Sequence, residues 1–310
     1  MSMMDPRKAF DAALLELGRE NKDVVGVSCD SALGGGMGSF FKAFPERTVE
    51  TGISEQTAIG ICAALAKQGM IPIIVVITPF ITMRAYEQVR DDIGYMNMNV
   101  KLVGSGGGLA YSTLGSTHQA IEDIALMRTI PNMTILSPCD SYDVREAIRM
   151  AVSIKGPVYI RMPRQARKVI AAERHVELAK AEVLKDGGDI AIFATGPMVE
   201  EAQIASEILK RDGIDAAVLG FMTVRPLDGV AIRDFAKKVR AVVTVEEHSV
   251  IGGFGSAVAE LLAPVKDAPP VHIMGISEGA KNTGPYNELL DHYGLTGERI
   301  AENIKQLVKE

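Results

Sequence analysis

Residues 49–69, VETGISEQTAIGICAALAKQG, are followed almost at once by a second apolar run, IPIIVVI at residues 71–77. The first stretch is typical of a helix that enters a core, because small and apolar residues follow Glu55. The second has the length and the β-branched content of a buried strand. A helix that leads into a strand with no polar face favours a parallel sheet covered by helices on both sides.

The same alternation of helix and strand continues along the chain. We expect helices at 6–20, 79–96, 118–130 and 141–154, and strands at 23–30, 99–108, 133–138 and 156–163. A second series has strands at 190–196, 215–221, 241–247 and 271–276, with helices at 198–211 and 228–238 and a further element at 252–263. This pattern predicts an α/β protein of two three-layer domains, the first with a mainly parallel sheet.

The predicted domains are residues 1–165 and the smaller 181–310, separated by a linker at 166–180. The linker region is charged and has no long apolar run, which is typical of a segment exposed to solvent.

Composition excludes several classes of protein. The net charge of −6 is spread along 310 residues, and no basic, aromatic-rich stretch suits a nucleic acid. The longest apolar run, residues 70–81, is too short to span a bilayer and contains two prolines. Cys29, Cys62 and Cys139 form no Cys-x-x-Cys pair, which favours reduced thiols. We therefore expect a cytoplasmic protein that binds neither nucleic acid nor a membrane.

Glu55 has two interpretations from the local sequence. In the first, Ser54 caps the helix and Glu55 complements the helix dipole, as acidic residues often do in a first turn. In the second, Glu55 is a partly buried carboxylate that shares a proton with a nitrogen atom of a ligand.

Glycine-rich loops and one histidine mark further candidate positions. The loops at 33–38, 104–108 and 252–255 would let backbone approach a ligand, but none has the spacing of a dinucleotide-binding or P-loop motif. His118 is expected at or just before a helix start, where it either makes structural hydrogen bonds or contacts a ligand.

Arg7, Arg161 and Arg164 are candidate anion-binding residues, because a guanidinium suits a phosphate group. Each of them could equally be a surface charge.

Taken together, these stretches resemble the transketolase family. The segments that carry the resemblance to its pyrimidine-binding domain are TGISEQTAIGICAALAKQG (51–69), PFITMRAYEQVRDDIGY (79–95), STHQAIEDIALMRTIPNMTILSPCD (116–140) and GPVYIRMPR (156–164). Two later segments, at 189–228 and 245–260, resemble the C-terminal domain that this family shares with 2-oxo-acid dehydrogenase beta subunits. The resemblance extends to 1-deoxyxylulose-5-phosphate synthase and covers nearly the whole chain.

The resemblance implies a thiamine diphosphate enzyme. Glu55 matches the glutamate that hydrogen-bonds the aminopyrimidine ring of the cofactor, where proton sharing favours the tautomer that generates the thiazolium ylide. Phe80 matches the aromatic residue that stacks on this ring, and Asp30 resembles an acid near the cofactor. Arg7 and Arg161 match residues that hold a substrate phosphate, and His118 matches a histidine that contacts substrate near the reacting carbons.

Two positions depart from the family pattern. Gly106 stands where transketolases carry a histidine, and Leu114 stands where they carry an aspartate that recognises a donor hydroxyl. The donor and acceptor sugars are therefore left open. His248, beside a glycine turn, is expected to be an interface or loop feature.

The chain has no Gly-Asp-Gly motif with a downstream Asn, which in this family holds Mg²⁺ and the cofactor diphosphate. We therefore expect the C-terminal subunit of a split transketolase, with an N-terminal subunit that supplies the diphosphate and Mg²⁺ domain. Homodimerisation within an α₂β₂ assembly is expected, with sugar phosphates as substrates and transfer of a two-carbon ketol unit from a ketose to an aldose. The alternatives are a 2-oxo-acid dehydrogenase beta subunit and an inactive regulatory subunit.

Overall fold

The protein forms two compact units in the computed structural model, which describes residues 4–170 and 174–309. The first unit is Met1–Gly107 with Leu126–Arg174, and the second is Gly108–Ala125 with His175–Glu310. The chain thus leaves the first unit after Gly107 and returns to it at Leu126, an excursion that the alternation of helix and strand does not predict. Each unit is a three-layer α/β structure, as predicted.

The sheet of the first unit is parallel. Its strands are β1 (Val24–Ser28), β2 (Thr48–Glu50), β3 (Ile71–Ile77), β4 (Lys101–Ser105), β5 (Thr134–Leu136) and β6 (Val158–Met162). Their order across the unit is β5, β6, β4, β3, β1, β2, and every pair is parallel. Strands β1, β4 and β6 are buried along their whole length, as expected where helices cover both faces of a sheet.

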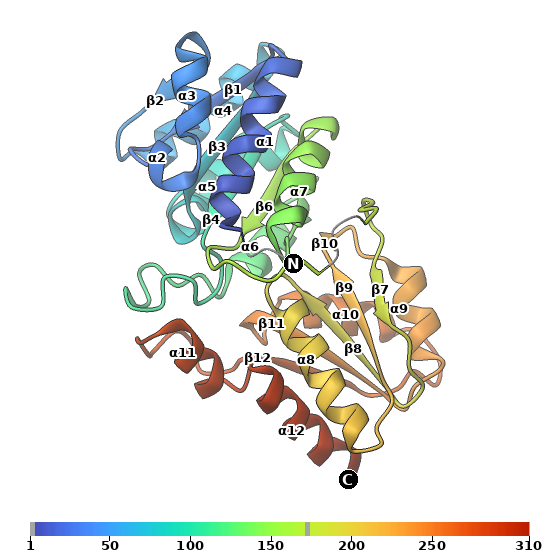
Figure 1. Cartoon of the computed structure of the whole chain (residues 1–310). Coiled ribbons are helices and arrows are strands. Elements are labelled where there is room, and N and C mark those ends of the chain that lie inside the picture. Colours follow the sequence, from blue (N-terminus) through green and yellow to red (C-terminus); the bar gives the residue numbers. More distant parts are fainter. Residues whose placement is uncertain (1–3, 171–173, 310) are drawn as a thin grey trace. The chain divides into compact units, whose positions relative to one another are not determined.

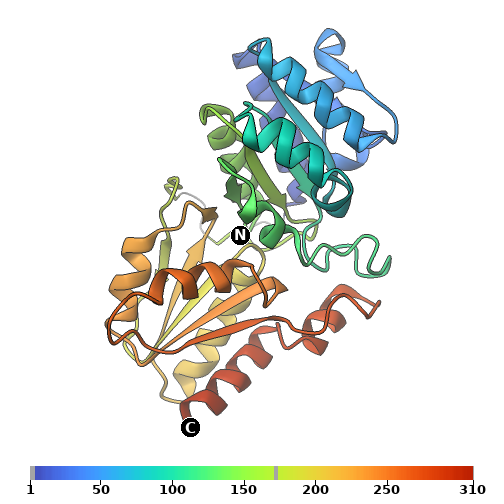
Figure 2. The same cartoon turned by 180° about the vertical axis from the view of Figure 1, so that it is seen from behind.

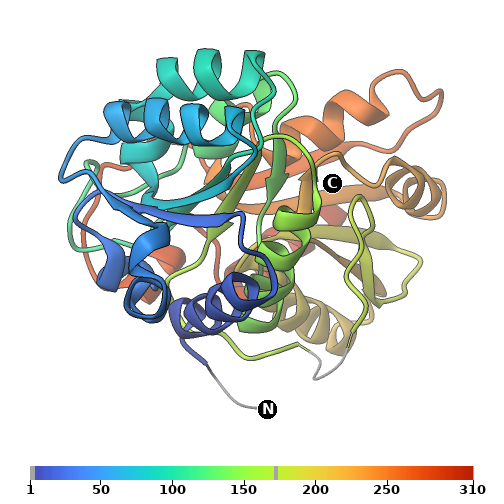
Figure 3. The same ribbon diagram turned by 90° about the horizontal axis from the view of Figure 1, so that it is seen from above.

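Helices cover both faces of this sheet. They are α1 (Pro6–Glu20), α2 (Ala32–Gly35), α3 (Gly38–Ala43), η1 (Pro45–Arg47), α4 (Glu55–Lys67), η2 (Phe80–Arg84), α5 (Tyr86–Gln88), η3 (Val89–Tyr95) and α7 (Ser141–Ser153). Helices α1 and α7 lie side by side on one face (Figure 1). Helix α4 and the 80–95 segment lie on the other face (Figure 2), and Figure 3 shows the layers end-on.

Two predicted helices differ from the observed ones. The helix predicted at 79–96 is built largely from the wider π-helical turns of η2 and η3. The helix predicted at 118–130 is wrong in its first residues, because α6 spans Asp123–Thr129. The backbone groups of Ala120 are used elsewhere: Gly108 and Ala120 exchange two hydrogen bonds of 2.8 Å in an isolated antiparallel bridge.

The second unit has a mixed sheet. The strands of this sheet are β7 (Glu182–Lys185), β8 (Ile190–Thr195), β9 (Ala216–Phe221), β11 (Ala241–Ser249) and β12 (Val271–Ile276). A short strand, β10 (Thr223–Arg225), follows β9 along the chain and is not part of this sheet. The order is β12, β11, β8, β9, β7, with only the β7–β9 pair antiparallel. Rings of Phe193, Phe221 and Phe254 follow one another at 5.5 and 5.2 Å, so that the sheet and one of its helices share an aromatic core.

Helices cover both faces of the second sheet as well. They are α8 (Met198–Arg211), α9 (Gly229–Ala236), α10 (Phe254–Leu262), α11 (Tyr286–His292) and α12 (Gly297–Lys309). Helices α8 and α12 pack together on one face (Figure 1), and α10 covers the other (Figure 2). Among the described residues, no helix combines the length and the apolar character needed to cross a membrane.

The predicted linker is not solvent-exposed throughout, so that expectation is wrong at Arg174. The side chain of Arg174 is only 5% exposed and binds Asp140 at 3.0 Å as well as Asp143. Its Nη2 also lies 3.4 Å from the Sγ atom of Cys139. A buried guanidinium needs such partners, and they hold this end of the linker against the first unit.

Lys101 is a buried lysine within β4. Its Nζ donates to Oδ1 of Asn99 at 2.7 Å and to the carbonyl oxygens of Ile154 and Gly156 at 2.7 and 2.8 Å. Burial lowers the pKa of Lys101 to about 7.

This pKa predicts a pH-dependent stability that Lys101→Met removes. Between pH 7 and 10 the unfolded lysine binds a proton that the folded one lacks, so the unfolding free energy of the wild type rises with pH. The unfolding free energy of the wild type minus that of Lys101→Met should therefore rise by up to about 1.4 kcal/mol per pH unit. Urea titrations at several pH values measure this difference. The exposed Lys67→Met serves as control and should show no such trend. A flat difference for Lys101→Met would mean that the three oxygen acceptors keep the ammonium charged.

Candidate active site

Glu55 is a buried carboxylate at the start of α4. Its side chain is 5% exposed, and its Oε1 accepts a hydrogen bond from Nη1 of Arg84 at 3.1 Å. Ser54 occupies the N-cap position, but its hydroxyl donates to the carbonyl oxygen of Thr51 and forms no side-chain cap hydrogen bond. The local interpretation of Ser54 as a capping residue is therefore wrong, while Glu55 does lie in the positive first turn of a helix.

Arg84 joins Glu55 to Phe80. The guanidinium carbon of Arg84 lies 4.0 Å from the centroid of the Phe80 ring, within cation–π range. Phe80 and Arg84 are the first and last residues of η2, directly after the carboxyl end of β3. These three side chains, called here the Glu55 cluster, come together through tertiary structure. Arg84 is not among the site residues predicted from the sequence, although it lies on the same predicted helix as Phe80.

The thiol of Cys29 lies near this carboxylate. Burial raises the pKa of Cys29, and the negative charge of Glu55 raises it further, while a hydrogen bond from Thr51 at 3.5 Å opposes both. Cys29 is therefore a neutral thiol at physiological pH and a poor nucleophile. The ionisable group available for chemistry here is the carboxylate of Glu55.

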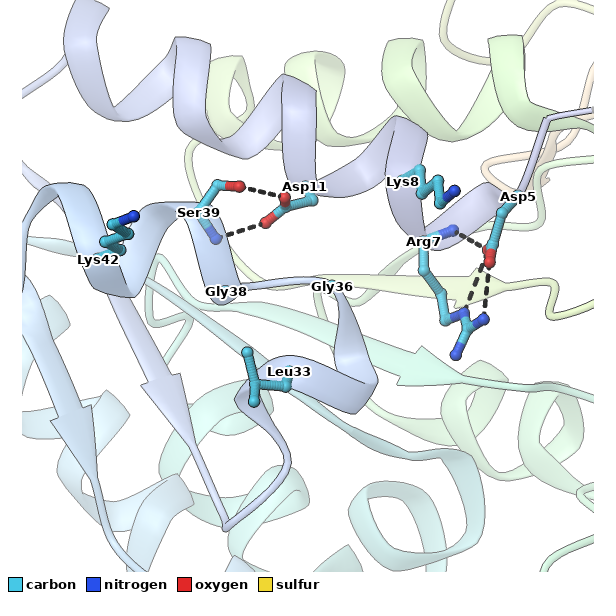
Figure 4. A pocket seen from close by; sticks show the side chains of 9 residues that line it. All are labelled: Asp5, Arg7, Lys8, Asp11, Leu33, Gly36, Gly38, Ser39 and Lys42. Atoms are coloured by element: carbon cyan, nitrogen blue, oxygen red, sulfur yellow. Dashed lines mark hydrogen bonds and ion pairs between the residues drawn. The ribbon is translucent and has the colours of Figure 1, made fainter.

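Arg7 lines a pocket at the start of α1 (Figure 4). The pocket has a volume of about 470 Å³ and is lined by Asp5, Arg7, Lys8, Asp11, Leu33, Gly36, Gly38, Ser39 and Lys42. Asp5 accepts hydrogen bonds from the backbone N–H of Arg7 at 2.9 Å and from its Nη2 at 2.6 Å, and this pairing lowers the pKa of Asp5. The predicted anion-binding arginine thus shares its pocket with two lysines and with carboxylates.

Gly36 brings a glycine-rich loop close to Arg7. Its φ is 84°, and a Cβ atom there would lie 2.6 Å from the carbonyl oxygen of Arg7. Both the left-handed backbone and the contact require glycine. The 33–38 loop therefore serves to pack against the first turn of α1.

Arg161 and Asp30 are not among the residues that line this pocket. Arg161 is on β6 and only 4% exposed, and a Cβ atom on Gly107 would lie 2.8 Å from its Nε. Asp30 follows β1, is exposed, has a φ of 57°, and donates its backbone N–H to Oε1 of Glu50 at 2.7 Å.

His118 belongs to the excursion at 108–125 and therefore to the second unit. Its ring centroid lies 5.8 Å from that of Tyr111, and its Nδ1 lies 2.9 Å from Oγ1 of Thr117. The expectation that it stands at a helix start is wrong, because it precedes α6 by a non-helical stretch. Of the two departures from the family pattern, Gly106 has a φ of 77° and Leu114 is 54% exposed.

Among residues 4–170 and 174–309, the group of side chains placed to hold a metal ion is Cys139, Asp140 and Asp143. It does not fit Mg²⁺. One of the three is a buried thiol whose pKa is raised well above its usual value, and Arg174 already binds the two carboxylates. A hard dication prefers a shell of oxygen ligands.

Comparison with known proteins identifies the family. The family model described as "Transketolase, pyrimidine binding domain" matches residues 2–168, and "Transketolase, C-terminal domain" matches residues 179–300. The chain belongs to the transketolase family.

Its relatives include single subunits of transketolases. The chain is 39% identical over 311 residues to one subunit of the apulose-4-phosphate transketolase of Phocaeicola vulgatus, covering 100% of this chain and 99% of that protein. It is 38% identical over 305 residues to a subunit of the 6-deoxy-6-sulfo-D-fructose transketolase of a Clostridium species, covering 98% and 94%. A solved structure described as "Split gene transketolase, inactive beta4 tetramer" superposes with a TM-score of 0.89 at 37% identity, covering 98% of each chain.

Other relatives are about twice as long. The chain is 35% identical to the 1-deoxy-D-xylulose-5-phosphate synthase of Heliobacterium modesticaldum, but it spans only 46% of that protein. These proteins therefore contain a long further region that this chain does not match.

Gly36→Ala should destabilise the first unit. The φ of 84° costs an alanine about 1–2 kcal/mol, and the contact with the carbonyl of Arg7 adds to this cost. Gly34→Ala, in the neighbouring α2, is the matched control because nothing lies within 4 Å of its Cβ position. Thermal unfolding should show a clearly lower melting temperature for Gly36→Ala, and no such decrease for Gly34→Ala. Equal melting temperatures for the two variants would mean that the loop does not need its left-handed glycine.

Proposed function

We propose that the chain is the C-terminal subunit of a split, thiamine-diphosphate-dependent transketolase. The enzyme would transfer a two-carbon ketol unit from a ketose phosphate to an aldose acceptor. The observation that carries this proposal is the Glu55 cluster, a buried carboxylate beside an aromatic ring and an arginine in a member of the transketolase family.

The donor set suits the pyrimidine half of thiamine diphosphate. A buried carboxylate can share a proton with a ring nitrogen, and the face of Phe80 offers a stacking surface. When bound, this cofactor supplies a carbon nucleophile for carbonyl chemistry. In our proposal Glu55 holds the proton at the ring nitrogen and Phe80 orients the ring. Arg84 would pair with the Glu55 carboxylate until the ligand arrives, and Asp30 would be an acid near the cofactor.

The substrate contacts are proposed to come from three residues. Arg7 and Arg161 would bind the phosphate group of the sugar, because guanidinium groups form paired hydrogen bonds with phosphate oxygens. Lys8 and Lys42 add positive charge to the Arg7 pocket, which also contains Asp5 and Asp11, and this charge supports the role. His118 would contact the substrate near the reacting carbons.

The diphosphate and Mg²⁺ would be held by a separate N-terminal subunit. The described residues offer no oxygen-rich cluster that suits Mg²⁺, and their one candidate group is bound by Arg174. The relatives named as single transketolase subunits support a divided enzyme, as does the solved beta tetramer that is described as inactive. We propose homodimerisation of this chain within an α₂β₂ assembly.

A cytoplasmic location is proposed on the strength of the cysteines. Cys29, Cys62 and Cys139 are buried free thiols, which suits a reducing compartment.

Partner dependence gives the first functional test. The chain alone should bind thiamine diphosphate with Mg²⁺ weakly in calorimetry and show no ketol transfer. Addition of the N-terminal subunit should restore both, because that subunit supplies the ligands for the diphosphate. Full activity of the isolated chain would refute the divided enzyme. Turnover of pyruvate with an artificial electron acceptor would point instead to the dehydrogenase class.

Glu55→Gln tests the catalytic carboxylate. In the complex with the partner, ketol transfer should fall by about 10² to 10⁴-fold, because the amide cannot share a proton with the ring nitrogen. The melting temperature should change little, since the amide oxygen can still accept a hydrogen bond from Arg84. The control is Glu201→Gln, which changes a buried glutamate of the second unit, whereas Glu55 lies in the first. This variant should retain activity. Unchanged transfer by Glu55→Gln would remove the catalytic assignment.

A further inference from the structure

The excursion at 108–125 is held by the end of one strand of the second unit. Three consecutive residues at the end of β11, Glu247–Ser249, bind backbone groups near both ends of the excursion. The excursion itself is closed by the bridge between Gly108 and Ala120. The segment that carries His118 is therefore a loop whose two ends meet at the β11 terminus.

Glu247 binds the beginning of the loop. Its side chain is 1% exposed, and its Oε1 accepts a hydrogen bond from the backbone N–H of Leu109 at 2.6 Å. The Oε2 atom accepts from the hydroxyl of Tyr286 at 2.8 Å. Gly108 lies directly against this carboxylate, because a Cβ atom there would be 2.6 Å from Oε1. A buried carboxylate is stable only with such donors, so the position of the loop and that of Glu247 depend on each other.

His248 and Ser249 bind the end of the loop. The Nδ1 atom of His248 lies 2.7 Å from the carbonyl oxygen of Ser249, which requires a proton on Nδ1. The Nε2 atom then accepts from the backbone N–H of Ala125 at 3.3 Å. The backbone N–H of Ser249 donates to the carbonyl of Ile121 at 2.7 Å. His248 is thus a buried residue that binds the end of the loop.

Gln119, the residue after His118, is bound to the 282–284 segment of the same unit. Nε2 of Gln119 donates to the carbonyl of Asn282 at 3.0 Å and to that of Ser112 at 3.1 Å. The backbone N–H of Gly284 donates to the same Ser112 carbonyl at 3.3 Å. Contacts with the 282–284 turn therefore limit the positions that the His118 backbone can take.

We propose that Glu247 is a positioning residue for His118. By binding the N–H of Leu109, Glu247 fixes the start of the loop and thereby holds His118 in the orientation that the substrate needs. Glu247 would in this way contribute to the specificity of the reaction without itself touching the substrate. The catalytic consequence rests on the proposed function, but the effect on the loop does not.

Hydrogen exchange of the full chain tests the effect on the loop. Glu247→Met keeps the size of the side chain but removes the acceptor for Leu109, so amides in a peptide spanning 107–119 should exchange about 10- to 100-fold faster. Glu247→Gln retains an acceptor oxygen and should restore most of the protection. Glu201→Met is the matched control, because Glu201 is also buried in the second unit and accepts from the N–H of Gly297 at 2.9 Å.

Kinetics of the complex with the N-terminal subunit test the effect on the reaction. Glu247→Met should lower kcat/KM for the ketose donor by about tenfold or more, with unchanged affinity for thiamine diphosphate, and Glu247→Gln should recover most of the loss. Gly108→Ala should reproduce the effect of Glu247→Met on exchange and on kcat/KM, because its Cβ atom would displace the same carboxylate.

The outcomes separate the two proposals. Exchange at 107–119 in Glu247→Met equal to that in Glu201→Met would overturn the role of Glu247, whatever the activity. Faster exchange with unchanged kcat/KM would overturn the link to the reaction. No ketol transfer by the unmodified complex would instead count against the proposed function, while the exchange data would still decide whether Glu247 holds the loop.

Discussion

Parallel pairing of buried strands is the constraint on which the first unit depends. Backbone N–H and C=O groups in a dry sheet must bond to neighbouring strands, and the parallel arrangement directs every carboxyl end to one edge. Cys29 follows β1, the loop to Glu55 follows β2, and Phe80 follows β3. Residues distant in the sequence are thereby collected at one edge, where backbone is no longer committed to the sheet and side chains can meet a ligand.

The buried ionisable side chains of this protein are stabilised in different ways. Lys101 donates to three oxygen atoms, Arg174 binds two carboxylates, and Glu247 accepts from a backbone amide and a tyrosine. These three groups are held by partners within the fold. Glu55 differs because its partner, Arg84, is 47% exposed and so remains accessible to an incoming ligand. Of these four side chains, Glu55 is the one whose pairing, with Arg84, suits exchange of a partner on binding.

The sequence predicted regular elements well where apolar periodicity was strong. The helix at 6–20, the strand at 71–77 and the helix at 198–211 agree with the structure to the residue. It failed where a backbone group had a distant partner. The helix expected from 118 begins later because Ala120 pairs with Gly108, and the linker expected in solvent contains the buried Arg174.

By itself, the sequence determined the two α/β series, the resemblance to transketolases and the candidate residues from Arg7 to Arg161, because these depend on local patterns of side chains. The tertiary structure alone decided that Arg84 pairs with Glu55, that the loop at 108–125 belongs to the second unit, and that Glu247 accepts a hydrogen bond from Leu109 in that loop. The Glu55–Arg84 contact joins residues that are 29 positions apart in the sequence, and the Leu109–Glu247 contact joins residues that are 138 positions apart. No local pattern encodes them, since only the folded chain brings their charges and backbone donors together.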